Sequence, residues 1–135
     1  AGQRAIKLGS IHPTRDFNYV LDVTRAFMAV AEADNTVGQV LNAGSDFEIS
    51  VGDLAQTIAR EMGVDIEIVT DEQRIRPDKS EVERLWAANA KIREYTGWTP
   101  EHGGLEGFKR GIRQTIAWFS DPANLALYKW DVYNV

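Results

Sequence analysis

Cysteine is missing from the 135 residues, histidine occurs only twice, and no long apolar run is present. A chain without cysteine has no disulfide, no thiolate nucleophile and no cysteine-based zinc or iron–sulfur site. His12 and His102 are too far apart in the sequence to form a metal-binding motif by spacing, so no metal site is expected. No stretch approaches the roughly 20 apolar residues of a membrane span, and no signal-peptide pattern opens the chain. The expected location is therefore the cytoplasm, with no membrane partner.

Positive charge is also scarce, because 15 lysines and arginines face 20 acidic residues and leave a net charge of -5. This balance argues against a broad surface for polyanions, so no nucleic-acid partner is expected. Any phosphate contact must come from individual arginines. A hydrophobic content of 44% and a charged content of 26% are ordinary for a globular protein. The length predicts one domain over residues 1–135, and the aromatic-rich residues 121–135 are expected to form a docking tail.

Short apolar-alternating segments occur between segments with helical periodicity. The segments predicted as strands are 5–8, 15–20, 39–43 and 64–69. Those predicted as helices are 21–33, 51–62 after a Ser50 cap, 89–95 with Asn89 as its cap, and 105–119. Residues 70–83 are dense in charge, contain Pro77 and show neither period, so they form the longest predicted loop. Long ordered loops are often functional. The alternation predicts an α/β or α+β domain but leaves its activity open.

Two groups of arginines could carry chemistry. Arg15 follows Pro13 on a short predicted strand, and its planar fork of donors suits a phosphate or carboxylate. The long loop carries further arginines between residues 74 and 84, with carboxylates beside them that could accept hydrogen bonds from ribose hydroxyls. Taken alone, each group is better explained as solvated surface charge.

Catalytic and cofactor motifs are missing from the same sequence. Both histidines lie in or beside predicted turns, where partial exposure is expected, and neither has a neighbour in sequence that would make it a catalytic base. Lys7 and Tyr19 do not form a Tyr-x-x-x-Lys pair. No Gly-x-Gly-x-x-Gly follows a strand. No catalytic and no cofactor-binding residue is therefore assigned, and the four tryptophans are expected to be core or interface anchors.

Five motifs nevertheless follow one another in an order typical of a known family. They are Pro13-Thr-Arg-Asp-Phe-Asn-Tyr-Val-Leu-Asp-Val23 before a helix, Val40-Leu-Asn-Ala-Gly44 before a Ser-capped helix, Arg76-Pro-Asp-Lys-Ser-Glu-Val-Glu-Arg-Leu85, Asn89-Ala-Lys91 with Thr96-Gly-Trp98-Thr-Pro100, and Gly104-Leu-Glu-Gly107. Together they resemble the C-terminal half of the extended short-chain dehydrogenases, the NAD-dependent epimerase/dehydratase family of nucleotide-sugar enzymes. The Ser-Glu-Val-Glu-Arg-Leu stretch and the ending Asp131-Val-Tyr-Asn-Val135 look most like the UDP-N-acetylglucosamine 4,6-dehydratases of legionaminic-type sugar pathways.

The resemblance implies a role for five residues. Arg15 and Arg76 would grip the pyrophosphate of a UDP-sugar, and Glu81 would accept hydrogen bonds from the ribose hydroxyls. Phe17 and Val82 would shape the nucleotide pocket. One departure is Ala88-Asn-Ala-Lys91, where the family commonly has Asp-x-Ser-Lys, so the contacts of that Asp and Ser are not inherited.

The family's glycine-rich turn, its Tyr-x-x-x-Lys and its Ser/Thr belong to an N-terminal half that these residues do not contain. The predicted fold is thus α/β, the C-terminal substrate-binding portion of a Rossmann-type extended short-chain dehydrogenase lacking its N-terminal dinucleotide-binding half. Residues 20–44 would return to the large sheet. NAD is expected in the complete enzyme only. Without its neighbours the strand near Val40 would expose an edge, so a homo-oligomer or an exchange of elements between copies is expected unless an N-terminal domain pairs with it.

Two function classes stay open on these residues. The first is the UDP-sugar-binding part of an NAD-dependent enzyme, a UDP-N-acetylhexosamine 4,6-dehydratase by motif, with an epimerase or decarboxylase of the same family as a variant. The second is a non-catalytic binding or assembly module that keeps a fragment of that fold. On either reading the chain by itself is predicted to be inactive.

Overall fold

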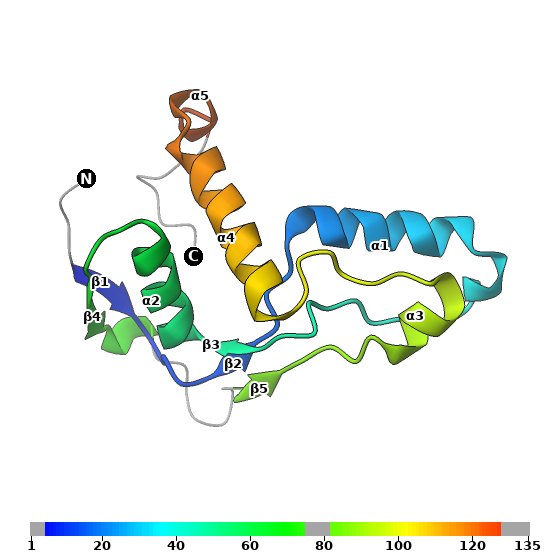
Figure 1. The fold of residues 1–135 in the computed structure, drawn as a ribbon. Coiled ribbons are helices and arrows are strands. Elements are labelled where there is room, and N and C mark those ends of the chain that lie inside the picture. The colour runs from blue at the N-terminus through cyan, green and yellow to red at the C-terminus, as the bar shows by residue number, and fades with distance from the viewer. Residues whose placement is uncertain (1–4, 75–81, 128–135) are drawn as a thin grey trace.

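The structure is a computed structural model that describes residues 5–74 and 82–127. In chain order the elements are β1 (Ala5–Leu8), β2 (Thr14–Arg15), α1 (Val20–Glu32), the 3-10 turn η1 (Asp34–Thr36), β3 (Ile49–Ser50), α2 (Val51–Glu61), β4 (Glu67–Thr70), the 3-10 turn η2 (Glu72–Arg74), β5 (Arg84–Leu85), α3 (Ala90–Thr96), α4 (Gly104–Ser120) and α5 (Pro122–Leu125). Figure 1 shows α2, β1 and β4 at one end of the molecule, α1 and α3 at the other, and α4 between them.

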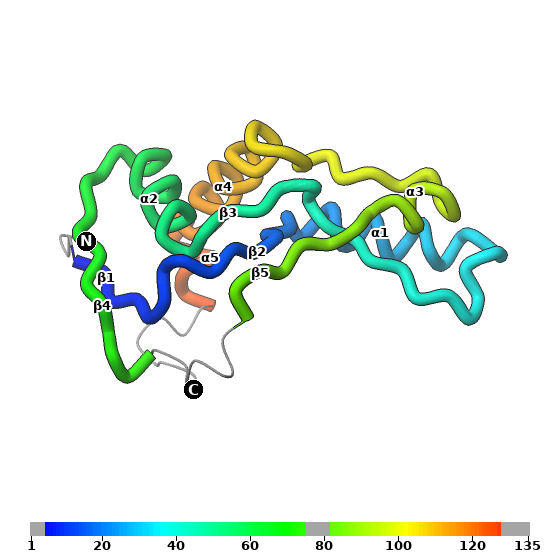
Figure 2. Tube along the Cα trace, turned by 90° about the horizontal axis from the view of Figure 1, so that it is seen from below, coloured from blue at the N-terminus to red at the C-terminus, as the bar shows by residue number. Residues whose placement is uncertain are grey.

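Two small sheets hold the described strands. The first pairs β1 with β4 in parallel, with Ala5 opposite Glu67 and Leu8 opposite Thr70. The second has the order β3-β2-β5, with β2 antiparallel to β3 and parallel to β5. Figure 2 shows these three strands side by side on the way to α1 and α3. β2 is therefore the central strand, and it joins three distant parts of the chain.

The helix boundaries follow local chemistry. The Ser50 hydroxyl accepts a hydrogen bond from the backbone N–H of Asp53 at 3.0 Å and caps α2, as its sequence predicts. Gly63, with a φ of 66°, follows α2, and Gly97, with a φ of 71°, ends α3. Only glycine takes this left-handed conformation without cost, which explains both stops. The helices predicted over 21–33, 89–95 and 105–119 are confirmed to within about a residue.

The predicted strands agree less well. The extended segment expected over 15–20 is confined to Thr14–Arg15, because α1 already begins at Val20. The strand expected over 64–69 begins only at Glu67. Residues 39–43 form no strand at all in the part of the chain that the structure describes, so that prediction was wrong. A strand needs a neighbour to hydrogen-bond, and among residues 5–74 and 82–127 no strand lies beside this segment.

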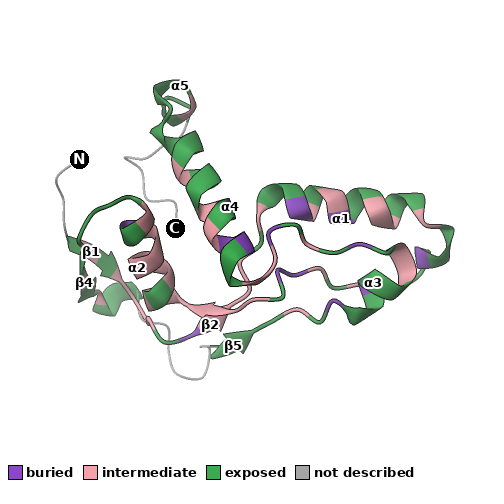
Figure 3. Cartoon of the chain, viewed as in Figure 1, coloured by how far each residue is buried: buried purple, intermediate pink, exposed green. Residues whose placement is uncertain are grey.

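The missing neighbour leaves an apolar face around α1. Phe27 and Val40 are 73% and 82% exposed. Phe27 lies at a hollow of about 360 Å³ lined mainly by α1 and residues 39–43. Figure 3 shows how much of α1 is exposed. The buried core is correspondingly small and centres on Ala26, Ile92 and Trp98.

The tryptophans divide between core and surface. Trp98 is buried as predicted, whereas Trp86 and Trp118 are exposed, and Trp130 lies outside the described residues. Within residues 5–74 and 82–127, no helix has both the length and the apolar character required to cross a membrane.

Candidate functional site

Arg15 is the predicted site residue that the fold positions most clearly. It stands on the central strand β2, opposite Ile49 of β3 and Leu85 of β5. The backbone N–H of Asp16 donates to Leu85 O at 3.0 Å and that of Thr14 to Glu83 O at 2.9 Å, which fixes the backbone on both sides of Arg15. Its Nη1 donates to Thr14 O at 2.8 Å, and the side chain is half-buried. The guanidinium therefore projects from a tethered strand.

The long charged loop returns to the fold next to Arg15. β5 closes the loop, and its parallel pairing with β2 brings the loop's C-terminal end beside Arg15. Val82, two residues before β5, is exposed. Arg76 and Glu81 lie outside the described residues. Two segments that the sequence separates widely are thus paired in the small sheet.

A charged cluster holds that edge together. Nε of Arg84 donates to both carboxylate oxygens of Glu48, at 3.0 and 2.8 Å, and Thr14 Oγ1 donates to Oε2 at 2.9 Å. These bonds, from Arg84 first and Thr14 second, hold the pKa of Glu48 below its ordinary value. The Arg84 guanidinium also lies 5.0 Å from the centre of the Trp86 ring. All three strands are therefore linked through side chains as well as backbone.

Asp16 and Asn89 hold the turn that follows residues 39–43. Oδ1 of Asp16 accepts hydrogen bonds from the Ser45 backbone N–H at 2.7 Å and from its hydroxyl at 2.6 Å, and Oδ2 accepts from the Ala87 N–H at 3.3 Å. Asn89 bonds both backbone groups of Gly44. Its side chain makes no hydrogen bond to its own helix, which corrects the predicted helix-capping role. Asn89 therefore organises a turn.

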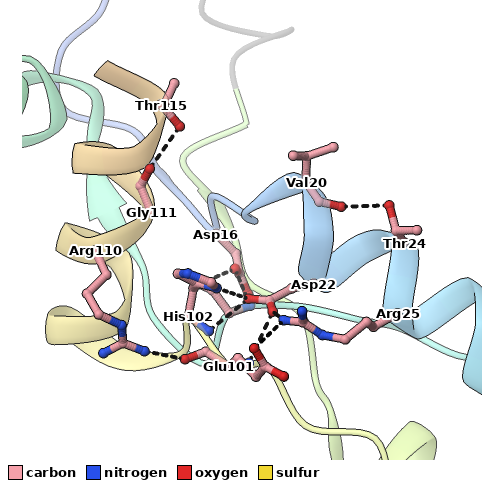
Figure 4. A network of polar contacts seen from close by, with 11 residues as sticks. Asp16, Val20, Asp22, Thr24, Arg25, Glu101, His102, Arg110, Gly111 and Thr115 are labelled. Carbon is pink, nitrogen blue, oxygen red and sulfur yellow. Dashed lines mark hydrogen bonds and ion pairs between the residues drawn. The ribbon is translucent and has the colours of Figure 1, made fainter. Parts of the chain in front are cut away.

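A buried acid, Asp22, connects α1 to the start of α4 (Figure 4). Its two oxygens accept from the backbone N–H groups of Glu101 at 3.1 Å and His102 at 2.9 Å, and it is only 1% exposed. Arg25 pairs with Asp22 and also with Glu101. Burial by itself would raise the pKa of Asp22, but the hydrogen bonds from His102 and Glu101 outweigh it and lower that pKa. The acid is thus ionised and structural.

His102 departs from its prediction as a partly exposed turn residue, because it is only 8% exposed. The Tyr19 ring lies 4.3 Å from its own, centre to centre, and Nδ1 lies 3.4 Å from Oδ2 of Asp22. One signal of this cluster is visible in the sequence, since Tyr19 and Asp22 are three residues apart and share a face at the start of a helix. The partner eighty residues along the chain could not be foreseen.

Phe17 lies on the wall of a small cavity beside this pair. The cavity measures about 60 Å³ and is also lined by Tyr19, His102 and Phe108. Sites for small molecules usually occupy about 300–1,000 Å³, so a nucleotide does not fit this cavity. Phe17 therefore packs toward α4, while Arg15 two residues earlier lies on the central strand of the sheet.

The described residues offer no site for a metal ion or a dinucleotide. Among residues 5–74 and 82–127, no group of three or more acidic or histidine side chains could hold a metal ion. No glycine-rich turn of the dinucleotide-binding kind occurs in the sequence. The residues present therefore do not fit NAD.

Comparison with known proteins decides the family. The sequence model described as GDP-mannose 4,6 dehydratase matches residues 1–115. The chain belongs to this family. It is accordingly a member of the NAD-dependent epimerases and dehydratases, which have the extended short-chain dehydrogenase fold of Rossmann type.

Three relatives illustrate the likeness. GDP-6-deoxy-D-mannose reductase of Pseudomonas aeruginosa is 32% identical over 96 residues, which cover 71% of this chain and 31% of the relative. The solved structure of RMD from Pseudomonas aeruginosa complexed with NADPH has a TM-score of 0.70 and 27% identity, over 84% of this chain and 34% of that one. UDP-glucose 4-epimerase from Thermotoga maritima, solved with UDP-glucose, has a TM-score of 0.69 and 26% identity, over 87% and 34%.

The chain spans about a third of the length of the curated relatives it matches. This fraction agrees with the predicted fold class, a portion of the extended short-chain dehydrogenase fold. The names of the relatives include both GDP- and UDP-linked sugars. What they share is a sugar on a nucleoside diphosphate, and the base differs among them.

Proposed function

We propose that this chain is the nucleotide-sugar-binding part of an NAD-dependent epimerase or dehydratase. The observation that carries the proposal is the pairing of β2 with β5, which brings Arg15 beside the end of the charged loop. In the proposal Arg15 and Arg76 bind the pyrophosphate, and Glu81 accepts hydrogen bonds from the ribose hydroxyls. Two guanidinium groups suit a pyrophosphate because each can make paired hydrogen bonds to its oxygens.

The chemistry would take place elsewhere in the complete enzyme. Bound NAD supplies hydride transfer at the sugar, and the dinucleotide half would hold it. We propose that this half covers the apolar face formed by α1 and residues 39–43, where it would supply the strand that Gln39–Ala43 lacks. This chain's own contribution is to bind the substrate and hold its diphosphate in place. Val82 and Phe17 would shape the nucleotide pocket only through the backbone on which Arg15 and Glu81 lie.

The finer assignment is a UDP-N-acetylhexosamine 4,6-dehydratase, acting in the cytoplasm as a homo-oligomer. It is supported by the Ser-Glu-Val-Glu-Arg-Leu stretch that ends in β5. The names of the relatives include both GDP-linked and UDP-linked sugars, so the nucleoside base that this chain prefers is the first point to test.

Isothermal titration of the 135-residue chain with UDP, GDP and UDP-N-acetylglucosamine tests the proposal. We expect saturable binding of UDP, and we expect Arg15→Ala and Arg76→Ala each to weaken it at least about tenfold, the loss of one charge-assisted contact. The matched control is Arg60→Ala, an exposed arginine on α2 away from β2, which should leave the affinity unchanged.

Two results would count against this function. Equal affinity in the wild type and the Arg15→Ala variant would remove Arg15 from the site. A folded chain that binds no nucleotide would favour the alternative, a non-catalytic assembly module. Tighter binding of GDP than of UDP would keep the nucleotide site and reject the UDP assignment.

A further inference from the structure

An apolar groove separates α2 from α4 at the end of the molecule away from α1. The two helices lie side by side (Figures 1 and 2), and Arg113 Nη1 pairs with Glu61 at 3.1 Å across them. Beyond this pair they leave a hollow of about 350 Å³. Its lining is almost wholly apolar and consists of Ile58, Met62, Ile112, Thr115, Ile116, Phe119 and Ser120.

Several large apolar side chains at this groove are open to solvent. Met62 is 53% exposed, Phe119 is 38% exposed, and neighbouring Trp118 is 46% exposed. Apolar surface gains roughly 25 cal/mol per Å² when it leaves water, so a cover over these residues would be stabilising. A hollow of this size and composition is the kind of surface that a hydrophobic segment fills.

The described part of the chain ends beside the groove. After Ser120 the short helix α5 turns back, capped by Asp121, whose Oδ1 accepts from the Ala123 N–H at 2.9 Å. Asn124 Nδ2 donates to Trp118 O at 3.1 Å and holds α5 against the end of α4. Leu127, the last residue described, is 84% exposed. The next eight residues therefore start at the groove's Phe119 end.

Those eight residues have the composition of a groove-filling strand. They read Tyr-Lys-Trp-Asp-Val-Tyr-Asn-Val, with Tyr128, Trp130 and Val132 at alternate positions and charges between them. In an extended chain alternate side chains share one face. Eight extended residues reach at most about 26–29 Å. That length matches the 17-residue α4, which is about 25 Å long.

We propose that residues 128–135 fold back along α4 and bury Trp130 and Val132 in the groove between α2 and α4. Lys129 and Asp131 then face solvent. Covalent attachment favours the chain's own tail over a second copy, because a short tether gives an effective concentration in the millimolar range. This inference does not depend on the nucleotide site, which lies at the β2–β5 edge.

The absence of cysteine makes cross-linking a clean test, since two introduced thiols are the only ones present. Met62→Cys combined with Val132→Cys places one thiol in the groove and one in the tail. The matched control combines Val132→Cys with Arg60→Cys, an exposed position on α2 outside the groove lining. A short bismaleimide is added at low protein concentration, and products are read by mass.

We expect an intramolecular link that forms at least about tenfold faster in the Met62 pair than in the Arg60 pair, the factor that separates a docked tail from a freely diffusing one. Equal rates in the two pairs would overturn the proposal. Links formed mainly between chains would overturn it too and would make a second copy the occupant.

A second measurement leaves the described core untouched. Trp130→Ala should speed amide hydrogen exchange of residues 112–119 several-fold, because the cover over that stretch of α4 is weakened. Lys129→Ala, on the solvent face in the proposal, should not. Unchanged exchange in Trp130→Ala would contradict the docking of the tail.

Discussion

Gly44 shows how tightly single residues are packed around the candidate site. A Cβ at this position would lie 2.3 Å from Oδ2 of Asp16 and 2.5 Å from the Cβ of Ala87. Real Cβ atoms do not approach other atoms so closely, so a side chain would push apart the turn that Asp16 and Asn89 hold. Glycine is required here by space.

Gly44→Ala should therefore lower the free energy of unfolding by about 2–3 kcal/mol, the cost of overpacking a close contact. Urea denaturation followed by circular dichroism measures it. The control is Gly63→Asn, where φ is 66° and nothing lies within 4 Å of an added Cβ. Asn tolerates this conformation, so a loss below about 1 kcal/mol is expected. Similar losses in both variants would contradict the steric argument.

Asp22 makes the free energy of unfolding depend on pH in the acidic range. The folded state lowers its pKa below the ordinary value of 3.8, so the unfolded chain takes up the proton more readily. The stabilisation is then complete at neutral pH and is lost as the pH falls below about 4 toward the lower folded-state pKa.

Asp22→Asn should remove this part of the pH dependence and cost about 2–3 kcal/mol at pH 7, because the amide cannot accept both backbone N–H groups and leaves Arg25 without its buried partner. Thermal unfolding between pH 2.5 and 7 compares the two proteins. Parallel stability curves over that range would show that Asp22 does not carry the effect.

At the scale of single residues, the sequence allowed Arg15 to be chosen as a candidate phosphate-binding residue, but it did not show which contacts hold that residue in place. Its neighbours suggested a strand and a motif suggested a phosphate, whereas the contacts that fix it come from Glu83 and Leu85, about seventy residues away. The burial of His102 was missed for the same reason. Contacts between distant residues leave no periodic trace in a single sequence.

Among the elements, helices were predicted far better than strands. The signals that define α2 are local in the sequence: a Ser50 cap, an apolar stripe and Gly63 after its end. A strand is not defined by local sequence alone, since its hydrogen bonds go to another segment. Residues 39–43 have the pattern of a strand and remain unpaired among the residues that the structure describes, which is why the prediction failed there.

The cap of α2 offers a test at the scale of the element. Ser50→Ala should cost about 1 kcal/mol, because the Asp53 N–H loses its side-chain acceptor. Ser50→Asp should restore most of that loss. Chemical denaturation of the three proteins decides it, and an Ala variant as stable as wild type would show that the cap contributes nothing.

For the whole molecule, we expect the open apolar face of α1 and residues 39–43 to govern association. Val40→Lys puts a charge on a side chain that is already 82% exposed, so the isolated fold should tolerate it. We expect the wild-type chain to associate as its concentration rises and Val40→Lys to shift it toward monomer by at least about tenfold in dissociation constant, the loss of roughly 1.4 kcal/mol. Light scattering over a dilution series measures this.

Glu32→Lys serves as the matched control because it changes charge at an exposed end of α1 without touching the apolar face. Association that is unaffected by Val40→Lys but abolished by Glu32→Lys would point to another interface.

The central position of β2 also has a kinetic consequence. Its two residues pair with strands that follow long intervening stretches of chain, and closing long loops is what slows folding. The helices can form from local sequence, whereas the strand that bears Arg15 must wait for both partners to arrive. We therefore expect the pairing of β2 with β3 and β5 to form late in folding and to open first in unfolding. A nucleotide bound at Arg15 would stabilise this pairing and so slow unfolding.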